Sequence, residues 1–407
     1  MPDLLVRFRS SATSENLLAL LAGGATMWGL PPEAHPVPAI LGMGVLLRLL
    51  DGSPSRRGAR LGFLFGLGHF IPGLAWLWSS LHVFGKIPAP VVVGMIVGLA
   101  AILSGYCALF GALLPRLVPA RWLLPLAAAA LWVVTEWLRA HLFSGFPWNL
   151  LGQVWDGSET CLQLADLGGV YLLSGLTLFL AGLLALAVPV GAGQGFRTPA
   201  VALVVALGVL GAGYGYGHWR LETLAADSGM LRVALVQGNV PQDLKWDPER
   251  KKDWLKRYLE HTRALEKPVD LVVWPETAVG FFLQISPEEL ARITTLSREI
   301  NAPILTGAPM ADRDGQNEWS YFNSMILIDS GETGKFASRY DKHHLVPYGE
   351  YIPFRSLAPA SMHKLTHGSK DFSTGPGPVT LNWGLDKIGP LICYEVIFPD
   401  EVRQLAV

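Results

Sequence analysis

Hydrophobic positions are distributed unevenly along this chain, in long continuous runs up to Arg220 and in short runs after Leu231. A helix needs about 20 largely uncharged residues to cross a bilayer. Four runs contain no Asp, Glu, Lys or Arg: residues 61–85, 87–115, 167–196 and 198–219. Residues 122–138 are a further candidate, and residues 16–47 have room for two short spans. The first part of the chain therefore predicts a bundle of about seven membrane-spanning helices.

After Leu231 short apolar runs alternate with charged, helix-like segments. An amphipathic pattern predicts a helix over residues 249–266, and Ser286 with Glu289 has the spacing of a capping box at the start of another. A last helix is expected after Phe398. Strands are predicted over residues 231–238, 271–274, 303–308, 321–328 and 387–393. This alternation is typical of an α/β or α+β layered domain.

Charge divides the chain at the same place. Residues 1–220 carry 12 Lys and Arg with 8 Asp and Glu, whereas residues 221–407 carry 20 and 25. Neither part has the strong basic excess of a nucleic-acid-binding protein, so we expect no nucleic-acid partner. Three cysteines are too few for a disulfide framework, and no spacing indicates a metal site. We predict a membrane domain over residues 1–220 and a polar domain over residues 221–407.

The basic residues also predict an orientation, because positively charged loops stay in the cytoplasm. One set of alternate loops holds nine: Arg7, Arg9, Arg48, Arg56, Arg57, Arg60, Arg116, Arg121 and Arg197. The other set holds Lys86, Arg139 and Arg220. The N-terminus is therefore expected in the cytoplasm, and seven crossings would place the polar domain in the periplasm. Trp148 lies in an outward loop, where an interfacial anchor is favoured over a substrate contact.

Three segments of the polar domain carry candidate chemistry. Glu276 ends a strand in LVVWPET, Lys342 and Glu350 lie in RYDKHHLVPYGEY, and Cys393 lies in PLICYEVIFPDE between a strand and a helix start. Amides at a helix N-terminus favour a thiolate. A thiol nucleophile needs a base and a cation for the developing oxyanion. Each residue alone has an ordinary explanation, as a core cysteine, a turn glutamate or a solvated lysine.

Together the segments resemble the carbon–nitrogen hydrolase (nitrilase) superfamily, and with the preceding spans they resemble the apolipoprotein N-acyltransferase family. The resemblance rests on VALVQGNVPQDLKW, WPETA, KHHLVPYGEYIPF and ICYEVIFP. It implies an αββα nitrilase-like sandwich without metal or cofactor, and a catalytic triad of Glu276, Lys342 and Cys393. Family chains continue about a hundred residues past the nucleophile, whereas 14 residues follow Cys393 here. The sandwich is therefore expected to be incomplete at its C-terminal end.

The resemblance also implies roles for neighbouring residues. Glu350 supports the lysine, Tyr394 and Glu395 follow the nucleophile in its motif, and Trp246 matches an aromatic residue near the active-site entrance. Trp246 and Trp148 are thus the two substrate-binding candidates.

The reaction implied is transfer of an acyl chain from a membrane phospholipid, with phosphatidylethanolamine as the expected donor. The acyl chain would be carried as a thioester and then transferred to the α-amine of a diacylglyceryl apolipoprotein at the bacterial inner membrane. One alternative is a membrane-tethered amidase acting on a small amide, and the apolar runs over residues 279–285 and 351–354 favour lipid access over it. Another is a transporter or a non-catalytic lipid-binding scaffold. Transport normally needs paired ionisable groups at mid-membrane, and only Glu136 and Asp166 occur, near span ends.

Overall fold

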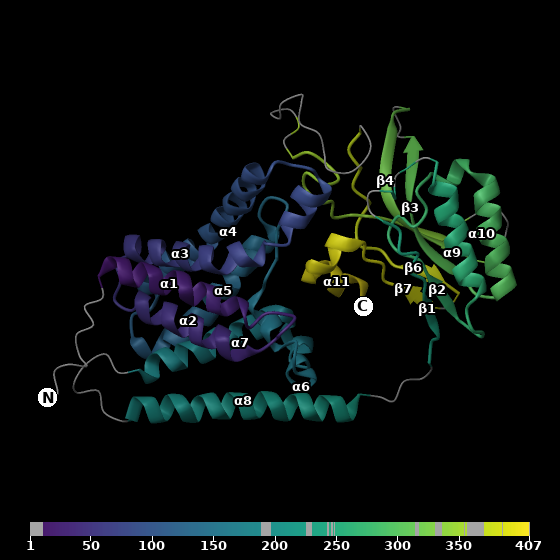
Figure 1. Cartoon of the computed structure of the whole chain (residues 1–407). Coiled ribbons are helices and arrows are strands. Elements are labelled where there is room, and N and C mark those ends of the chain that lie inside the picture. The colour runs from purple at the N-terminus through teal and green to yellow at the C-terminus, as the bar shows by residue number, and fades with distance from the viewer. Residues whose placement is uncertain are drawn as a thin grey trace. The chain divides into compact units, whose positions relative to one another are not determined.

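The computed structural model divides the chain into two compact units, residues 1–225 and 226–407 (Figure 1). The predicted domain boundary at residue 220 falls inside helix α8 (Arg197–Thr223), the last helix of the first unit. The structure describes residues 11–188, 197–224, 230–241, 244–245, 247, 249–313, 317–329, 336–353, 355, 370–384 and 386–406.

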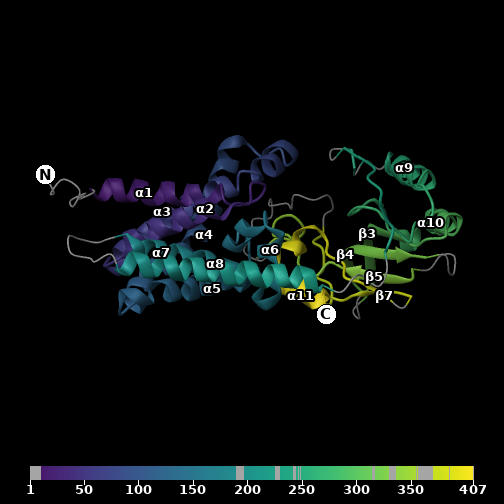
Figure 2. The same ribbon diagram turned by 90° about the horizontal axis from the view of Figure 1, so that it is seen from below.

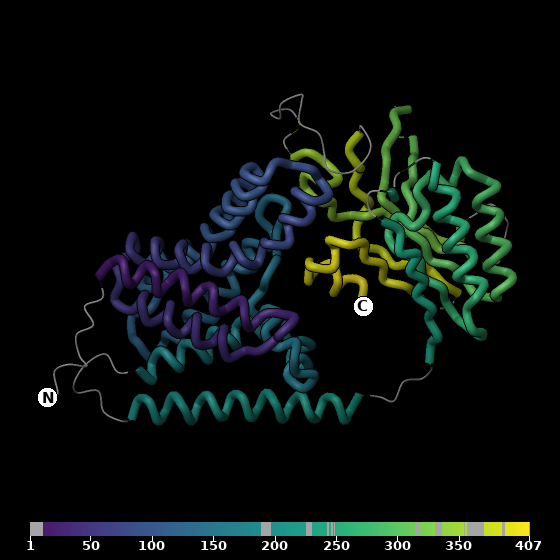
Figure 3. The backbone as a smooth tube through the Cα atoms, in the orientation of Figure 1, coloured from purple at the N-terminus to yellow at the C-terminus, as the bar shows by residue number. Residues whose placement is uncertain are grey.

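The first unit is a helical bundle, whose path is traced in Figure 3. Its other described helices are α1 (Ala12–Met27), α2 (Pro36–Leu50), α3 (Ser55–Gly73), α4 (Ala89–Leu117), α5 (Leu124–His141), the short α6 (Glu159–Leu162) and α7 (Ala165–Ala187).

Four helical stretches among the described residues are long and apolar enough to cross a membrane. They are Ala89–Leu117, Arg121–His141, Ala165–Ala187 and Arg197–Thr223. Each corresponds to a predicted span, although the predicted run over residues 167–196 continues beyond the end of α7 and beyond the described residues. Helices α1 and α2 have 16 and 15 residues, short of the usual length for a full crossing. A crossing by α1, α2 and α3 stays a prediction.

The apolar run over residues 61–85 does not form one continuous helix, as a single span would require. Helix α3 begins earlier, at Ser55, and ends at Gly73. Pro72 lies in its last turn, and proline cannot donate the backbone hydrogen bond that would continue a helix. A separate π-helical turn follows at Ser79–Phe84.

Helices α3 and α4 pack at very short range through small residues. A Cβ atom added to Gly58 would lie 2.1 Å from the carbonyl oxygen of Gly111, and one added to Gly62 would lie 2.1 Å from that of Cys107. Small residues of this kind let the backbones of membrane helices approach closely. The bundle is therefore held partly by backbone contact, which a larger side chain at either glycine would prevent.

A buried acid and a buried base fix the irregular chain between α5 and α7. Glu136 accepts hydrogen bonds from the Trp132 indole and from the Leu151 backbone N–H, both at 2.9 Å. Arg139 donates to the carbonyl oxygens of Phe146, at 3.1 Å, and Trp148. Non-helical backbone inside a membrane bundle needs such partners for its polar groups. The two charged side chains thus hold the loop that contains Trp148.

Trp148 is partly buried in this bundle. Its indole N–H donates to the carbonyl oxygen of Gly73 at 2.9 Å, and its ring lies 5.2 Å from that of Trp76. These contacts attach the loop to the end of α3. A substrate-binding role for Trp148 stays a prediction.

The second unit contains a five-stranded sheet in the order β1-β2-β3-β4-β5. The first three strands run parallel, and β4 and β5 are antiparallel to their neighbours. The strands are β1 (Val233–Leu235), β2 (Leu271–Val273), β3 (Ile304–Arg313), β4 (Trp319–Ile328) and β5 (Ser338–Asp341). Figure 2 shows helices α9 (Lys251–Arg263) and α10 (Pro287–Ile300) on one side of this sheet, with β7 on the other.

Alternate residues of the central strands form two hydrophobic cores. Val272, Ile304 and Ile326 pack in the core that includes residues of α9 and α10. Their neighbours Leu271, Leu305 and Leu327 pack in a second core, which includes Leu381 and Ile392. Because successive side chains of a strand point to opposite faces, the sheet is covered on both. The predicted α/β layering is confirmed.

Two local predictions in this unit were wrong. Residues 387–393 do not form one strand, because β7 (Asp386–Ile388) pairs with β6 (Leu381–Trp383) and ends before Pro390, which has no N–H for a ladder. Helix α10 starts where expected, but the Ser286 side chain makes no capping bond. Glu289 pairs instead with Lys252 of α9, at 3.0 Å. The last described helix, α11 (Pro399–Leu405), follows Phe398 as predicted.

Candidate active site

Glu276 lies just beyond the carboxyl end of β2, on a segment pressed against β3. A Cβ atom added to Gly307 of β3 would lie 2.7 Å from the Cα atom of Glu276 and 2.4 Å from the backbone nitrogen of Thr277. Thr277 itself has a φ of 47°, a conformation that costs a non-glycine residue about 1–2 kcal/mol. The close approach therefore needs glycine at position 307 and fixes the position of Glu276.

Lys342 follows β5 directly and is almost completely buried, with 1% of its surface exposed. Its backbone N–H extends the pairing with β4 by donating to the carbonyl oxygen of Asn323 at 2.8 Å. Its ammonium group lies 2.9 Å from Oε2 of Glu350, which is also buried. A buried ammonium needs such a partner to remain charged. The predicted support of Lys342 by Glu350 agrees with this contact, although the catalytic role of either residue stays a proposal.

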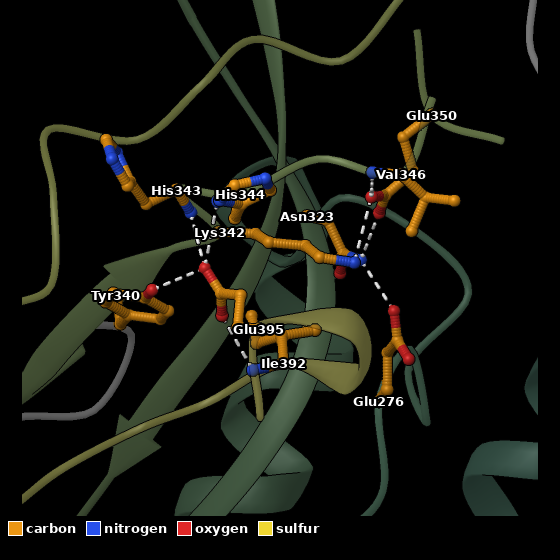
Figure 4. Close-up of polar contacts among 10 residues, drawn as sticks. All are labelled: Glu276, Asn323, Tyr340, Lys342, His343, His344, Val346, Glu350, Ile392 and Glu395. Carbon is orange, nitrogen blue, oxygen red and sulfur yellow. Dashed lines mark hydrogen bonds and ion pairs between the residues drawn. The ribbon is translucent and has the colours of Figure 1, made fainter. Parts of the chain in front are cut away.

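Asn323 of β4 connects the two carboxylates of the site (Figure 4). Its side-chain Nδ2 donates to Oε1 of Glu276 at 2.7 Å and to Oε1 of Glu350 at 2.9 Å. Only the nitrogen of the amide can donate to both oxygens, so the two contacts fix its orientation. The result is one connected set in which Glu276, Asn323, Glu350 and Lys342 determine one another's positions.

Cys393 begins a short 3₁₀-helical turn that extends to Ile397. Its φ is 53°, in the left-handed region that non-glycine residues rarely adopt, and the residue is exposed to solvent. The preceding Ile392 is buried in the second core. The thiol thus lies on a sharp turn that follows a buried residue of the second core, rather than at the end of a strand as predicted.

Glu395 anchors this turn to the segment that carries Lys342. It is fully buried, and its Oε1 accepts from the Tyr340 hydroxyl at 2.6 Å and from the backbone N–H groups of His343 and His344 at 2.7 and 3.1 Å. Its Oε2 accepts from the Ile392 N–H at 2.7 Å. Figure 4 shows this carboxylate between the two segments. Glu395 therefore holds the lysine and the cysteine segments together without being presented to solvent.

Tyr394 points into an aromatic group beside this anchor. Its ring centroid lies 5.7 Å from that of His344 and 5.1 Å from that of Phe398. His344 stacks on Phe398 at 3.6 Å, and its Nδ1 lies 2.9 Å from Oε1 of Glu401. These contacts give the turn after Cys393 a second attachment to the Lys342 segment.

The electrostatic surroundings do not favour a thiolate in the resting site. Although Cys393 is accessible, desolvation by the surrounding protein raises the pKa of its thiol, and the charge of Glu276 acts in the same direction. Lys342 lowers this pKa, and Glu350 raises it. The backbone N–H of Tyr394 lowers the pKa of Cys393, as expected for an amide at the start of a helical turn, but desolvation and the two carboxylates outweigh it. The same interactions show that Glu276, Lys342 and Cys393 are brought into one electrostatic environment.

Sequence reasoning missed Asn323 and the short strand β5. A polar side chain inside the apolar run YFNSMILI was the available signal for Asn323. Of the predicted site residues, Trp246 lies outside the described residues. Groups of His, Cys, Asp and Glu that could hold a metal ion are absent from the described part of the chain.

The structure brings a cysteine on a sharp turn into the electrostatic surroundings of a glutamate and a lysine beside a layered α/β sheet, as the resemblance to the carbon–nitrogen hydrolase class implies. A family model described as carbon-nitrogen hydrolase matches residues 232–407, and one described as the apolipoprotein N-acyltransferase N-terminal domain matches residues 22–183. The chain belongs to the apolipoprotein N-acyltransferase family.

Individual relatives support this assignment. The apolipoprotein N-acyltransferase of Geobacter metallireducens is 34% identical over 407 residues, which cover 99% of this chain and 76% of that protein. The one of Caulobacter vibrioides is 34% identical, covering 97% of this chain and 75% of that protein. A solved CN-hydrolase superfamily protein from Xanthomonas campestris shares 25% identity, covering 42% of this chain and 56% of its own. Its TM-score is 0.27, too low to add to the argument.

Proposed function

We propose that this chain is an acyltransferase that acylates the N-terminal amine of lipoproteins, with Cys393 as the residue that carries the acyl group. The observation that carries the proposal is the accessible Cys393 turn beside the connected set of Glu276, Asn323, Glu350 and Lys342. The membership of the chain in the apolipoprotein N-acyltransferase family supports the identity of the acceptor.

The first half-reaction would acylate the enzyme. Glu276 takes the proton of the Cys393 thiol, and Sγ attacks an ester carbonyl of a membrane phospholipid, with phosphatidylethanolamine as the proposed donor. Lys342 stabilises the negative charge on the tetrahedral oxyanion. The ester C–O bond then breaks, and a lysophospholipid leaves with the proton returned by Glu276. A thioester on Cys393 remains.

The second half-reaction would transfer the acyl group to the acceptor. The α-amine of a diacylglyceryl-cysteine attacks the thioester carbonyl, and Glu276 accepts the proton that the amine loses. The C–S bond breaks, an amide forms, and the proton passes to Sγ to restore the thiol. Both substrates are anchored in lipid, so attachment of the polar unit to membrane helices raises their effective concentration at the site.

The alternative of a small-amide hydrolase uses the same residues with water as the second acceptor. The apolar runs expected to distinguish the two are mostly packed inside the unit. Val279, Leu283 and Ile352 are buried, whereas Ile285 is 73% exposed. The family relationship, rather than these runs, therefore favours the acyltransferase.

A labelling experiment tests the function. Incubation of the purified chain with acyl-labelled phosphatidylethanolamine is expected to give a labelled protein whose label is released by hydroxylamine. Cys393→Ala should abolish the label, whereas Cys107→Ala and Cys161→Ala should retain it. Addition of a diacylglyceryl lipopeptide should move the label to the peptide. Labelling that persists in Cys393→Ala, or release of the label only to water, would contradict the proposal.

We also propose that the N-terminus is cytoplasmic and that the second unit lies in the periplasm of a bacterial inner membrane. The nine-to-three distribution of Lys and Arg between alternate loops supports this orientation. A reporter that is active only in the periplasm should work when fused after residue 229 and be silent when fused after Gly52. The reverse pattern would overturn the orientation.

A further inference from the structure

Lys245 is a half-buried cation next to the active site that the mechanism above does not use. Its Nζ donates a hydrogen bond to the backbone carbonyl oxygen of Glu276 at 3.0 Å. Burial lowers the pKa of Lys245, while the charges of Glu276 and Cys393 raise it. The ammonium group is therefore within electrostatic reach of both the proposed base and the proposed nucleophile.

The charges around the thiol are unbalanced without this lysine. Glu276 and Glu350 are negative and Lys342 is positive, and all three act on Cys393. Lys342 is 1% exposed and lies 2.9 Å from Glu350, so these two opposite charges compensate each other. When the proton moves from Cys393 to Glu276, one negative charge disappears from the carboxylate and another appears on sulfur. These groups therefore carry a net negative charge at every stage, which a neighbouring cation would stabilise.

We propose that Lys245 is the second cation of this site, a positioning residue that fixes the Glu276 backbone and stabilises the negative charge that develops at Cys393. The inference rests on the proposed function only for the identity of the reaction, because its effect on the thiol can be measured without acyl transfer. An opposite charge near a group favours the ionised form of that group. The thiolate should accordingly be less stable once this charge is removed.

Lys245→Gln separates the charge from the hydrogen bond, because the glutamine amide can still donate to the Glu276 carbonyl oxygen. Lys245→Met removes both, and Lys245→Arg retains the charge. Lys256→Met is the matched control, since it removes an exposed lysine that forms a salt bridge with Glu260, one turn along α9, at 3.8 Å. All variants would carry Cys107→Ala and Cys161→Ala, so that Cys393 is the remaining thiol.

The measurement is the rate of Cys393 alkylation by iodoacetamide as a function of pH, in the purified full chain. We expect the midpoint of the profile to move up by roughly one pH unit in Lys245→Gln and Lys245→Met. It should stay in place in Lys245→Arg and Lys256→Met. In the acylation assay, Lys245→Gln should lower kcat much more than it changes KM for the phospholipid.

Two results would overturn the inference: an unchanged alkylation profile in Lys245→Gln, or a profile in Lys245→Arg that moves as far as in Lys245→Met. A purely structural role would lower the thermal stability of every Lys245 variant without separating arginine from glutamine. Failure of acyl transfer in the parent protein would contradict the proposed function, yet it would leave the alkylation result intact. The two failures are thus distinguishable.

Discussion

Each unit of this protein buries an acid and a base, but the two pairs are used differently. In the helical unit Glu136 and Arg139, 2% and 4% exposed, direct their hydrogen bonds mainly at the backbone of one irregular loop. In the layered unit Glu350 and Lys342, 5% and 1% exposed, contact each other and connect through Asn323 to Glu276. The first pair stabilises a fold, whereas the second forms part of a group of side chains beside an accessible thiol.

Burial of charge is therefore a weak guide to chemistry by itself. Leaving one member of a buried pair without its partner typically costs about 3–5 kcal/mol, whatever the pair does. What distinguishes the second pair is the accessible Cys393 thiol on a strained turn, which Glu395 holds against the same segment as Lys342. Three experiments would break or sharpen this comparison.

The largest difference is expected between Lys342→Met and Arg139→Met. Loss of an oxyanion-stabilising group typically lowers the rate about 100- to 1,000-fold, so Lys342→Met should lose activity per folded molecule by that factor. Arg139→Met should instead lower the yield and thermal stability of the protein while the folded fraction keeps most of its activity. Acyl transfer and thermal unfolding measured on equal amounts of folded protein check this. Equal losses of specific activity in both variants would remove the distinction.

A smaller effect is expected from Gly307→Ala. The added methyl group would meet the backbone of Glu276 and Thr277, so the base must shift. A displacement of about 1 Å in a catalytic group can cost roughly 100-fold in rate. Gly280→Ala is the matched control, because its nearest contact is the Lys251 side chain at 3.5 Å, an ordinary van der Waals distance. Full activity of Gly307→Ala would show that the position of Glu276 is not critical.

The smallest expected change is in the alkylation of Cys393 in Glu276→Gln, and its sign is opposite to that of the change in acyl transfer. Because the Glu276 charge raises the pKa of Cys393, removal of this charge should lower that pKa. The fraction of Cys393 present as thiolate should then increase at pH values below the pKa. Alkylation by iodoacetamide at pH 7 should become faster by up to about tenfold, if the pKa falls by one unit. Acyl transfer should fall, since glutamine cannot accept the proton. Slower alkylation at pH 7 would mean that the carboxylate activates the resting thiol.

The sequence alone predicted the layers and singled out the candidate site residues, but not how the side chains of the site are connected. Apolar runs correctly predict the positions of α4, α7 and α8, because a membrane-spanning helix must be long and largely uncharged. Both properties can be read directly from the sequence. Glu276, Lys342 and Cys393 stand out through their motifs.

Asn323 was missed because its position in the site depends on strand register. The register places its backbone opposite Lys342, which follows β5, and residues close to Asn323 in the sequence give no sign of this pairing. The sequence predicts a strand that ends at Cys393, because the apolar residues on either side of Pro390 (Ile388, Leu391 and Ile392) resemble a buried strand until the pairing is known. Long-range pairing, and not local preference, decides both features.

The four hydrogen bonds of Glu395 have a consequence for when the site can form during synthesis. Tyr340, His343 and His344 precede their shared acceptor by 55, 52 and 51 residues. Closing a loop of this length carries an entropic cost before any contact compensates for it, and a chain emerges from the ribosome N-terminal end first. The segment that contains Lys342 is therefore synthesised well before Glu395, whose carboxylate fixes the position of that segment. Assembly of the reactive centre should be among the last steps of folding, after the sheet and its two helices have formed.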